Sequence, residues 1–330
     1  MTTVLDRLNQ TLLHALESDE RVYILGEDIL DPYGGAFKVT RGLSTRFPGR
    51  VLTTPISEAA IVGTATGMAL RGLRPVAEIM FGDFLTLTAD QLVNHAAKFR
   101  WMYNDQVHVP MVVRTPMGGR RGYGPTHSQS IEKMFMGVPG LKVVAANTLG
   151  DPGVLLENAI ADENPVLFIE HKLLYPLPLL EEGKGELIDL HVEKSRDAYP
   201  TFTLHPEAEA SLTIACYGYS FELARRVVNQ LMIERELFAE IVLFTKLSPF
   251  ALEPLYASLH KTQRLLTVEE GTLTLGWGAE VAARAVETVE GLRVKRVAAR
   301  DLPIANSRLL ENVILPMEAD IVRAAIEISE

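Results

Sequence analysis

Glu58 is the only acidic residue in the stretch "TTPISEAAIVGTATGMALRG" (residues 53–72), where it precedes a long segment of apolar and small residues. Ser57 can cap a helix at this point, and a carboxylate suits the positive end of a helix dipole, so capping alone would account for the acid. The second interpretation is chemical. A partly desolvated carboxylate at the mouth of a buried helix can share a proton with a ligand nitrogen.

The same stretch contains Gly63 and Gly67, four residues apart, with Ala59 one turn earlier. Residues at this spacing share one face of a helix. Each glycine costs a helix about 1 kcal/mol relative to alanine, a cost that is explained if another backbone approaches closely. The spacing therefore predicts a tight helix–helix interface between subunits, with Glu58 at its edge.

Two further segments contain candidate site residues. Phe81 and Phe84 follow the apolar run in "EIMFGDF", at the end of a strand where open α/β sheets bind ligands, although Phe81 is also explained as a core aromatic. His127 follows a glycine-rich loop in "GGRRGYGPTHSQS". An imidazole can transfer protons near neutral pH, but an isolated histidine can equally be structural.

The elements that must position these residues alternate between strands and helices. Amphipathic segments at 89–102 and 152–161 separate several short apolar runs, which are "VYILGED", "PVAEIM", "VPMVVRTP", "LKVVAA" and "PVLFIE". This alternation predicts parallel strands with crossover helices, covered on both faces. The pattern stops between Leu173 and about Glu209 and then resumes. We predict an α/β protein with two doubly wound domains at 1–175 and 210–330, joined by a linker at 176–209.

Composition restricts the class of protein. The 330 residues are 47% hydrophobic and 22% charged, and the net charge is −10, which disfavours nucleic acid or an anionic membrane as partner. No apolar run reaches the ~20 residues of a membrane span. The first residues predict an amphipathic helix rather than a targeting signal, so we expect a cytoplasmic location. Cys216 is the only cysteine and is expected to be a buried small hydrophobic residue.

Taken together, the motifs resemble one family, the β subunits of the thiamine-diphosphate-dependent 2-oxoacid dehydrogenases, with their transketolase-like pyrimidine-binding domain. The resemblance covers nearly the whole chain in order. Its motifs are "ILGEDILDPYGGAFKVTRGL", "TTPISEAAIVGTATGMALRGLRPVAEIMFGDF", "DQLVNHAAKFRWM", "THSQSIE", "PGLKVVAANT", "NPVLFIEHKLLYP", "KLSPF", "VEEGTLTLGWGAEVAAR" and "DLPIANSRLLENVILP".

The resemblance implies a role for each candidate. Glu58 matches the glutamate that hydrogen-bonds N1′ of the cofactor's aminopyrimidine ring and promotes loss of the proton at thiazolium C2. Phe84 matches the aromatic residue that stacks on this ring, and Ile56 and Met80 match residues that line the pocket. His127 matches the histidine that assists transfer to the lipoyl acceptor. Family members often hold a potassium ion at positions that correspond to Met111, Ala159, Asp162 and Asn164.

The chain lacks the Gly-Asp-Gly segment through which thiamine enzymes hold Mg²⁺ and diphosphate, as well as a lipoyl-bearing segment and a Rossmann fingerprint. The resemblance therefore implies an α subunit that supplies the Mg²⁺–diphosphate half, an α₂β₂ heterotetramer with a second β subunit, and a lipoyl acyltransferase as the acceptor. The sequence departs from the family at Ala60, Tyr103 and Ala305, which leaves interface details and substrate preference open.

Two alternatives remain at this stage. One is the β half of a split thiamine-dependent synthase or transketolase-like enzyme that passes its acyl or ketol group to a non-lipoyl acceptor. The other is a non-catalytic scaffold, against which the joint presence of Glu58, Phe84 and His127 argues. Pyruvate, branched-chain oxoacids and acetoin-type substrates all remain possible.

Overall fold

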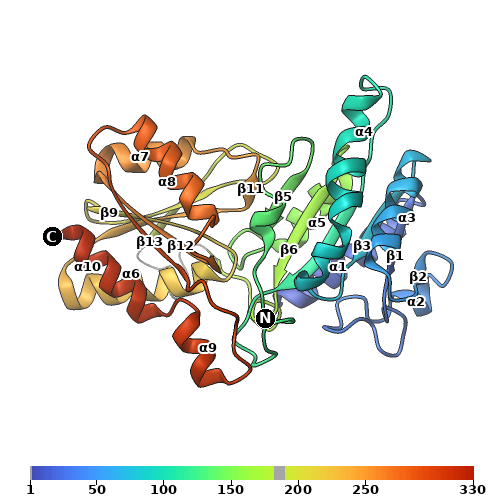
Figure 1. The fold of residues 1–330 in the computed structure, drawn as a ribbon, viewed down its shortest axis with the longest axis horizontal. Helices are drawn as coiled ribbons and strands as arrows, with labels where there is room; N and C mark the ends of the chain where they lie inside the picture. Colours follow the sequence, from blue (N-terminus) through green and yellow to red (C-terminus); the bar gives the residue numbers. More distant parts are fainter. Residues whose placement is uncertain (1, 182–189) are drawn as a thin grey trace. The chain divides into compact units, whose positions relative to one another are not determined.

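The computed structural model describes residues 2–181 and 190–330, which divide into two compact units. The first unit comprises Met1–Met117 and Met134–Leu179, and the second comprises Gly118–Lys133 and Leu180–Glu330. Figure 1 shows that each unit contains a sheet with helices packed beside it. The segment Gly118–Lys133 thus belongs to the second unit although the first unit continues after it, a departure from a single boundary near residue 175. No helix in the described ranges combines the length and the apolarity needed to cross a bilayer.

The strands of the first unit are parallel and run in the spatial order β5-β6-β4-β3-β1-β2. Their bounds are β1 (Val22–Gly26), β2 (Val51–Thr53), β3 (Arg74–Glu78), β4 (Val112–Met117), β5 (Lys142–Ala145) and β6 (Val166–His171). Residues of β4 and β6 are buried throughout, as expected when helices cover both faces of a parallel sheet. All the apolar runs predicted as strands in this half of the chain form strands. β2 lies on one side of β1 and β3 lies on the other, so the order in which the chain adds strands switches at β1. Open α/β sheets bind ligands at the carboxyl ends of the strands that flank such a switch, which here are β1 and β3.

Helices connect these strands. They are α1 (Val4–Ser18), α2 (Leu43–Arg46), α3 (Glu58–Leu70), a 3₁₀ segment η1 (Gly82–Thr88), a π-helical segment η2 (Gln91–Ala96), α4 (Ala97–Met102) and α5 (Pro152–Ala161). The helix expected over 89–102 is therefore divided into a π-helical and an α-helical part. Ser57 occupies the N-cap position of α3, but its side chain makes no capping hydrogen bond, so the predicted cap is only positional.

The second unit contains a mixed sheet in the order β13-β12-β9-β10-β8-β7. Its central strands are parallel, whereas β8 runs antiparallel to both β10 and β7. The strands of this sheet are β7 (Leu190–Lys194), β8 (Phe202–Pro206), β9 (Leu212–Tyr217), β10 (Ala239–Phe244), β12 (Arg264–Thr272) and β13 (Arg293–Ala299). A short strand, β11 (Lys246–Ser248), belongs to this part of the chain but not to this sheet. The helices are α6 (Ser220–Arg235), α7 (Glu253–Thr262), α8 (Trp277–Thr288), α9 (Arg308–Ile314) and α10 (Glu318–Ser329), and a 3₁₀ turn η3 spans Glu132–Met134. Cys216 is fully buried on β9, as predicted.

The predicted linker at 176–209 needs correction. Its later part forms β7 and β8, which pair as an antiparallel hairpin at the edge of the second sheet. Three of the five residues of β7 are exposed, and its apolar residues Leu190 and Val192 alternate with polar ones. The backbone of β7 pairs with that of β8. Residues 182–189, which also fall in the predicted linker, lie outside the described residues.

Candidate active site

Glu58 is the first residue of α3, and its side chain is buried, with 6% of the residue exposed. Helix α3, which Glu58 begins, consists mainly of apolar and small residues on all sides and has no charged face that would keep Glu58 in solvent. The free N–H groups of the first turn favour a negative charge at this end. The structure thus presents a buried carboxylate at the positive end of a helix.

Glu27 is a second buried carboxylate, and the analysis of the sequence assigned it no role. It directly follows β1, is 6% exposed, and its Oε1 atom is buried without a hydrogen-bond partner among the described residues. Burial and the negative charge of Glu58 raise the pKa of Glu27 above its ordinary value. A charged residue immediately after an apolar strand, in "VYILGED", was the available signal. The two buried carboxylates are therefore close enough for the charge of Glu58 to act on Glu27.

Three other predicted site residues lie on the segments that follow β2 and β3. Ile56 is 84% exposed, whereas Met80 and Phe84 are partly buried. The rings of Phe81 and Phe84 meet edge to face with centroids 6.0 Å apart, so Phe81 supports the position of Phe84. An acid, an aromatic ring and apolar side chains suit a flat, aromatic heterocycle with ring nitrogens. The residues therefore fit the aminopyrimidine half of thiamine diphosphate.

Gly82 allows the segment with Phe84 to lie directly against β4. A Cβ atom at this position would come within 2.2 Å of Met117 Cγ, far closer than atoms can approach. Any larger residue would push η1 away from the sheet and displace Phe84 with it. The glycine in "FGDF" is therefore a packing requirement of the site.

A buried charged network that was not predicted from the sequence joins strands β3, β4 and β6 of the first sheet. Arg114 donates two hydrogen bonds to the Glu170 carboxylate, at 2.8 and 2.6 Å, and pairs with Glu78 through its third nitrogen. Tyr175 donates to Glu170 at 2.6 Å. Burial raises the pKa of Glu78 despite the opposing effect of Arg114. Glu78, Arg114 and Glu170 each lie near the end of a parallel strand, so the network ties β3, β4 and β6 together.

His127 lies in the segment Gly118–Lys133 of the second unit, whereas Glu58, Ile56, Met80 and Phe84 lie in the first. Its ring is partly buried, and Nδ1 is 3.0 Å from the hydroxyl of Thr126. Its backbone N–H donates to the carbonyl of Gly124 at 3.4 Å. The imidazole is thus oriented from within its own loop.

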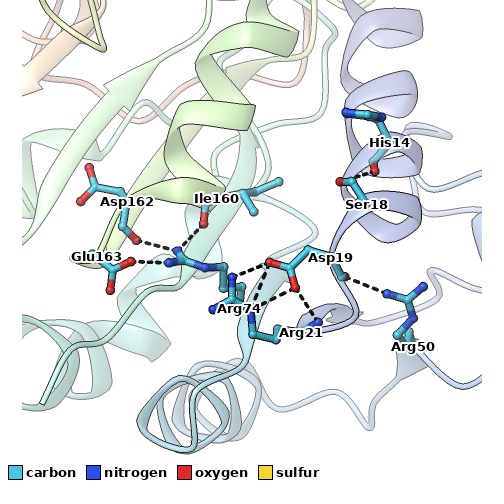
Figure 2. Close-up of polar contacts among 9 residues, drawn as sticks. All are labelled: His14, Ser18, Asp19, Arg21, Arg50, Arg74, Ile160, Asp162 and Glu163. Atoms are coloured by element: carbon cyan, nitrogen blue, oxygen red, sulfur yellow. Dashed lines mark hydrogen bonds and ion pairs between the residues drawn. The ribbon is translucent and has the colours of Figure 1, made fainter.

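The predicted potassium site is a well-defined loop at the end of α5. The Asp162 carboxylate accepts hydrogen bonds from the backbone and side chain of Asn164 and from the ammonium of Lys142. Burial opposes ionisation of Asp162, but these donors hold its pKa below the ordinary value. Figure 2 shows Arg74 reaching from β3 to the carbonyl oxygens of Ile160, at 2.8 Å, and Asp162, at 3.3 Å. The ammonium of Lys142 is therefore already the cation that pairs with the side chain of Asp162.

The other two predicted ligands present backbone carbonyls to neighbouring amides. The Met111 carbonyl accepts from Val166 N at 2.9 Å, and the Ala159 carbonyl accepts from Asp162 N at 3.3 Å. Each carbonyl oxygen retains a second lone pair. Within the described ranges, no group of three or more histidine, cysteine or acidic side chains could hold a metal ion. A cation in this loop would consequently be held by backbone oxygens rather than by carboxylates.

The model of the transketolase pyrimidine-binding domain matches residues 2–178, and that of the transketolase C-terminal domain matches residues 204–321. A solved chain described as a split-gene transketolase, an inactive β₄ tetramer, superposes with a TM-score of 0.76 over 100% of this chain and 99% of its own length. At 18% identity, this similarity concerns the fold alone.

Several curated relatives match over almost their whole length. The chain is 36% identical to the pyruvate dehydrogenase E1 component subunit beta-1, mitochondrial, of Arabidopsis thaliana, covering 98% of this chain and 88% of that protein. It is 34% identical to the pyruvate dehydrogenase E1 component subunit beta, mitochondrial, of Caenorhabditis elegans, covering 98% of this chain and 91% of that protein. It is 33% identical to the pyruvate dehydrogenase E1 component subunit beta of Rickettsia bellii, covering 98% and 97%. The chain therefore belongs to the family of β subunits of 2-oxoacid dehydrogenase decarboxylating (E1) components, built from transketolase-type pyrimidine-binding and C-terminal domains.

Proposed function

We propose that this chain supplies the aminopyrimidine half of a thiamine diphosphate site and, together with an α subunit, decarboxylates a 2-oxo acid oxidatively and transfers the acyl group to a lipoyl acyltransferase. Pyruvate is the substrate class that the names of the relatives favour. One observation carries the proposal: the buried Glu58 begins the apolar helix α3 beside the equally buried Glu27.

Glu58 is proposed to hold or release a proton at N1′ of the aminopyrimidine ring, because a desolvated carboxylate makes a strong hydrogen bond to a ring nitrogen. Phe84 is proposed to stack on the ring, and Ile56 and Met80 to exclude water around it. When bound, the cofactor supplies a nucleophilic carbon and an electron sink for decarboxylation.

His127 is proposed to assist the second half-reaction, in which the acyl group passes to the lipoyl sulfur. We expect His127→Ala to slow this transfer far more than it slows decarboxylation measured with an artificial oxidant. A matched control is His260→Ala, which changes a histidine in the last turn of α7. Equal losses in both assays would exclude a specific role of His127 in transfer. Undiminished turnover with a non-lipoyl acceptor would instead favour a split synthase or transketolase-like enzyme.

The α subunit is proposed to hold Mg²⁺ and the diphosphate, since this chain has no Gly-Asp-Gly segment. Calorimetry on the purified chain and on the co-expressed α–β complex tests the whole proposal. We expect tight, Mg²⁺-dependent thiamine diphosphate binding by the complex and none by the chain alone. Micromolar binding by the isolated chain would contradict the division of the site between subunits.

A potassium ion is proposed to bind the carbonyl oxygens of Met111, which precedes β4, and of Ala159 in α5, with Asp162 and Asn164 in the loop that follows α5. A ligand that binds only the folded state stabilises it in proportion to the logarithm of its concentration. The melting temperature of the complex should therefore be higher in potassium chloride than in sodium chloride at equal ionic strength. Identical melting curves would exclude the site.

A further inference from the structure

The glycine-rich loop that precedes His127 is folded around a buried carboxylate from a distant part of the chain. Glu311, in the middle of α9, has no exposed surface, and its two oxygens face the loop. Oε1 accepts from Arg120 N at 2.6 Å, and Oε2 accepts from Gly122 N at 3.1 Å. One carboxylate thus binds two backbone amides of the same loop.

The backbone of the loop adopts the conformation that such binding needs. Gly118, Arg120, Gly122 and Gly124 all have positive φ, and Arg120, at 68°, is a residue type that rarely adopts it. Alternating backbone conformations of this kind turn successive N–H groups inward and form a concave anion site. Here Glu311 itself occupies the concave site. Without the carboxylate, the partly buried N–H groups of Arg120 and Gly122 would lose their hydrogen-bond acceptor. The hydrogen bonds that offset the strained backbone of Arg120 would then be lost.

A second carboxylate and the segment after α9 complete the cradle. Glu270 accepts from Gly119 N at 2.7 Å and from Arg120 Nε at 3.0 Å. The guanidinium of Arg120 also donates to the carbonyl of Pro316 at 2.6 Å. The loop is therefore held from β12 and from both ends of the 311–316 segment.

Gly119 shows how closely the loop approaches these groups. A Cβ atom there would lie 2.7 Å from Leu315 Cδ1 and 2.8 Å from Glu311 Oε1. Since alanine cannot fit without displacing the loop, Gly119→Ala would separate the loop from Glu311 while leaving the carboxylate in place.

We propose that Glu311 is a positioning residue for His127: its carboxylate binds the backbone amides of Arg120 and Gly122 and so fixes the loop from which the imidazole projects. The connection to His127 is direct, because the carbonyl of Gly124 accepts the hydrogen bond from His127 N. The catalytic consequence rests on the proposed role of His127 in acyl transfer.

The test uses the full chain co-expressed with its α subunit and compares Glu311→Gln with the wild type. An amide would turn an N–H group towards the N–H donors of the loop. We expect amide hydrogen exchange in peptides covering residues 118–124 to accelerate on the order of tenfold, the value of one hydrogen bond to a charged acceptor. Transfer to lipoamide should fall in parallel, while decarboxylation with an artificial oxidant changes by less than about threefold.

Glu318→Gln is the matched control, because Glu318 pairs with Arg226 on the surface of α10 rather than with the loop. Gly119→Ala serves as the second variant should Glu311→Gln assemble poorly. If both act by displacing the same loop, the effects of Glu311→Gln and Gly119→Ala on exchange will be less than additive in the double variant.

Exchange that stays at the wild-type rate in Glu311→Gln and in Gly119→Ala would overturn the proposal. So would faster exchange with full transfer activity, provided that His127→Ala loses transfer. If His127→Ala itself transfers normally, the proposed role of His127 fails, whereas accelerated exchange in Glu311→Gln would still establish that Glu311 holds the loop.

Discussion

Glu27 and Glu58 are buried carboxylates from different elements, and the negative charge of Glu58, together with burial, raises the pKa of Glu27. One follows the end of β1 and the other begins α3, so the fold of the first unit brings them together. Because its pKa is raised, Glu27 takes up a proton more readily than an ordinary glutamate.

The first prediction separates the two acids. Glu58→Gln should lower kcat by roughly 10²–10⁴, since an amide cannot exchange a proton with a ring nitrogen. Glu27→Gln should lower kcat by less than about tenfold, because glutamine resembles the protonated form of Glu27. Steady-state rates of the co-expressed complexes with an artificial oxidant would measure both. Losses of equal size would mean that Glu27 must ionise during turnover.

The second prediction concerns the network under the first sheet. Arg114 is 1% exposed and forms ion pairs with both Glu170 and Glu78. Arg114→Met would leave two buried carboxylates without a cation and should reduce the free energy of unfolding by about 3–5 kcal/mol. Urea denaturation would measure the change, with Arg284→Met as the control. Arg284 pairs with Glu280 on the surface of α8, where such a pair contributes about 0–1 kcal/mol. A cost below about 1 kcal/mol for Arg114→Met would contradict the network's role in stability.

The third prediction follows from Glu269, a residue of β12 whose carboxylate accepts hydrogen bonds from the first N–H groups of α8. Burial and the nearby Glu132 raise its pKa from 4.5 to about 7, against the opposing hydrogen bonds from Gly278 N and Trp277 N. The folded chain therefore binds this proton more tightly than the unfolded chain. The resulting stabilisation is fully present below pH 4.5 and is lost as the pH rises through about 7.

A rise of that size corresponds to about 3 kcal/mol. Relative to Glu269→Gln, which cannot titrate, the wild type should therefore lose about this much unfolding free energy between pH 5 and pH 8. Denaturant titrations at several pH values would follow the difference, with Glu280→Gln on the surface of α8 as the control. A difference that is constant across this range would rule out the raised pKa.

The fourth prediction addresses assembly. Gly63 and Gly67 are exposed on α3, and a Cβ atom at Gly67 would meet nothing within 4 Å. The chain itself therefore has room for a larger residue there, whereas a second β subunit packed on this face would not. Gly67→Leu should weaken the β–β contact by about 1–3 kcal/mol per site and shift the complex to smaller species before the chain unfolds.

Size-exclusion chromatography with light scattering would detect this change. Ala283→Leu places the same side chain on the exposed face of α8 and is the control. A Gly67→Leu variant that remains fully assembled and active would remove α3 from the interface.

The sequence by itself was sufficient for the features that depend on local patterns. Continuous apolar runs predicted the parallel strands, because a strand buried on both faces needs apolar residues at every position. The isolated Glu58, the aromatic Phe84 and the histidine after the glycine loop could be recognised through motifs that occupy short, ordered stretches. Cys216 followed in the same way from its apolar neighbours.

Only the tertiary structure decided which distant charges meet. Arg114 and Glu170 are joined by the register of β4 with β6, and Glu311 reaches Arg120 across 191 positions of sequence. The hairpin of β7 and β8 exists because each strand supplies the backbone partners of the other. In all three cases the stabilising groups are polar atoms, whose favourable energy depends on a hydrogen-bond partner within about 3 Å. No local pattern encodes that partner, since packing of the whole unit brings it into place.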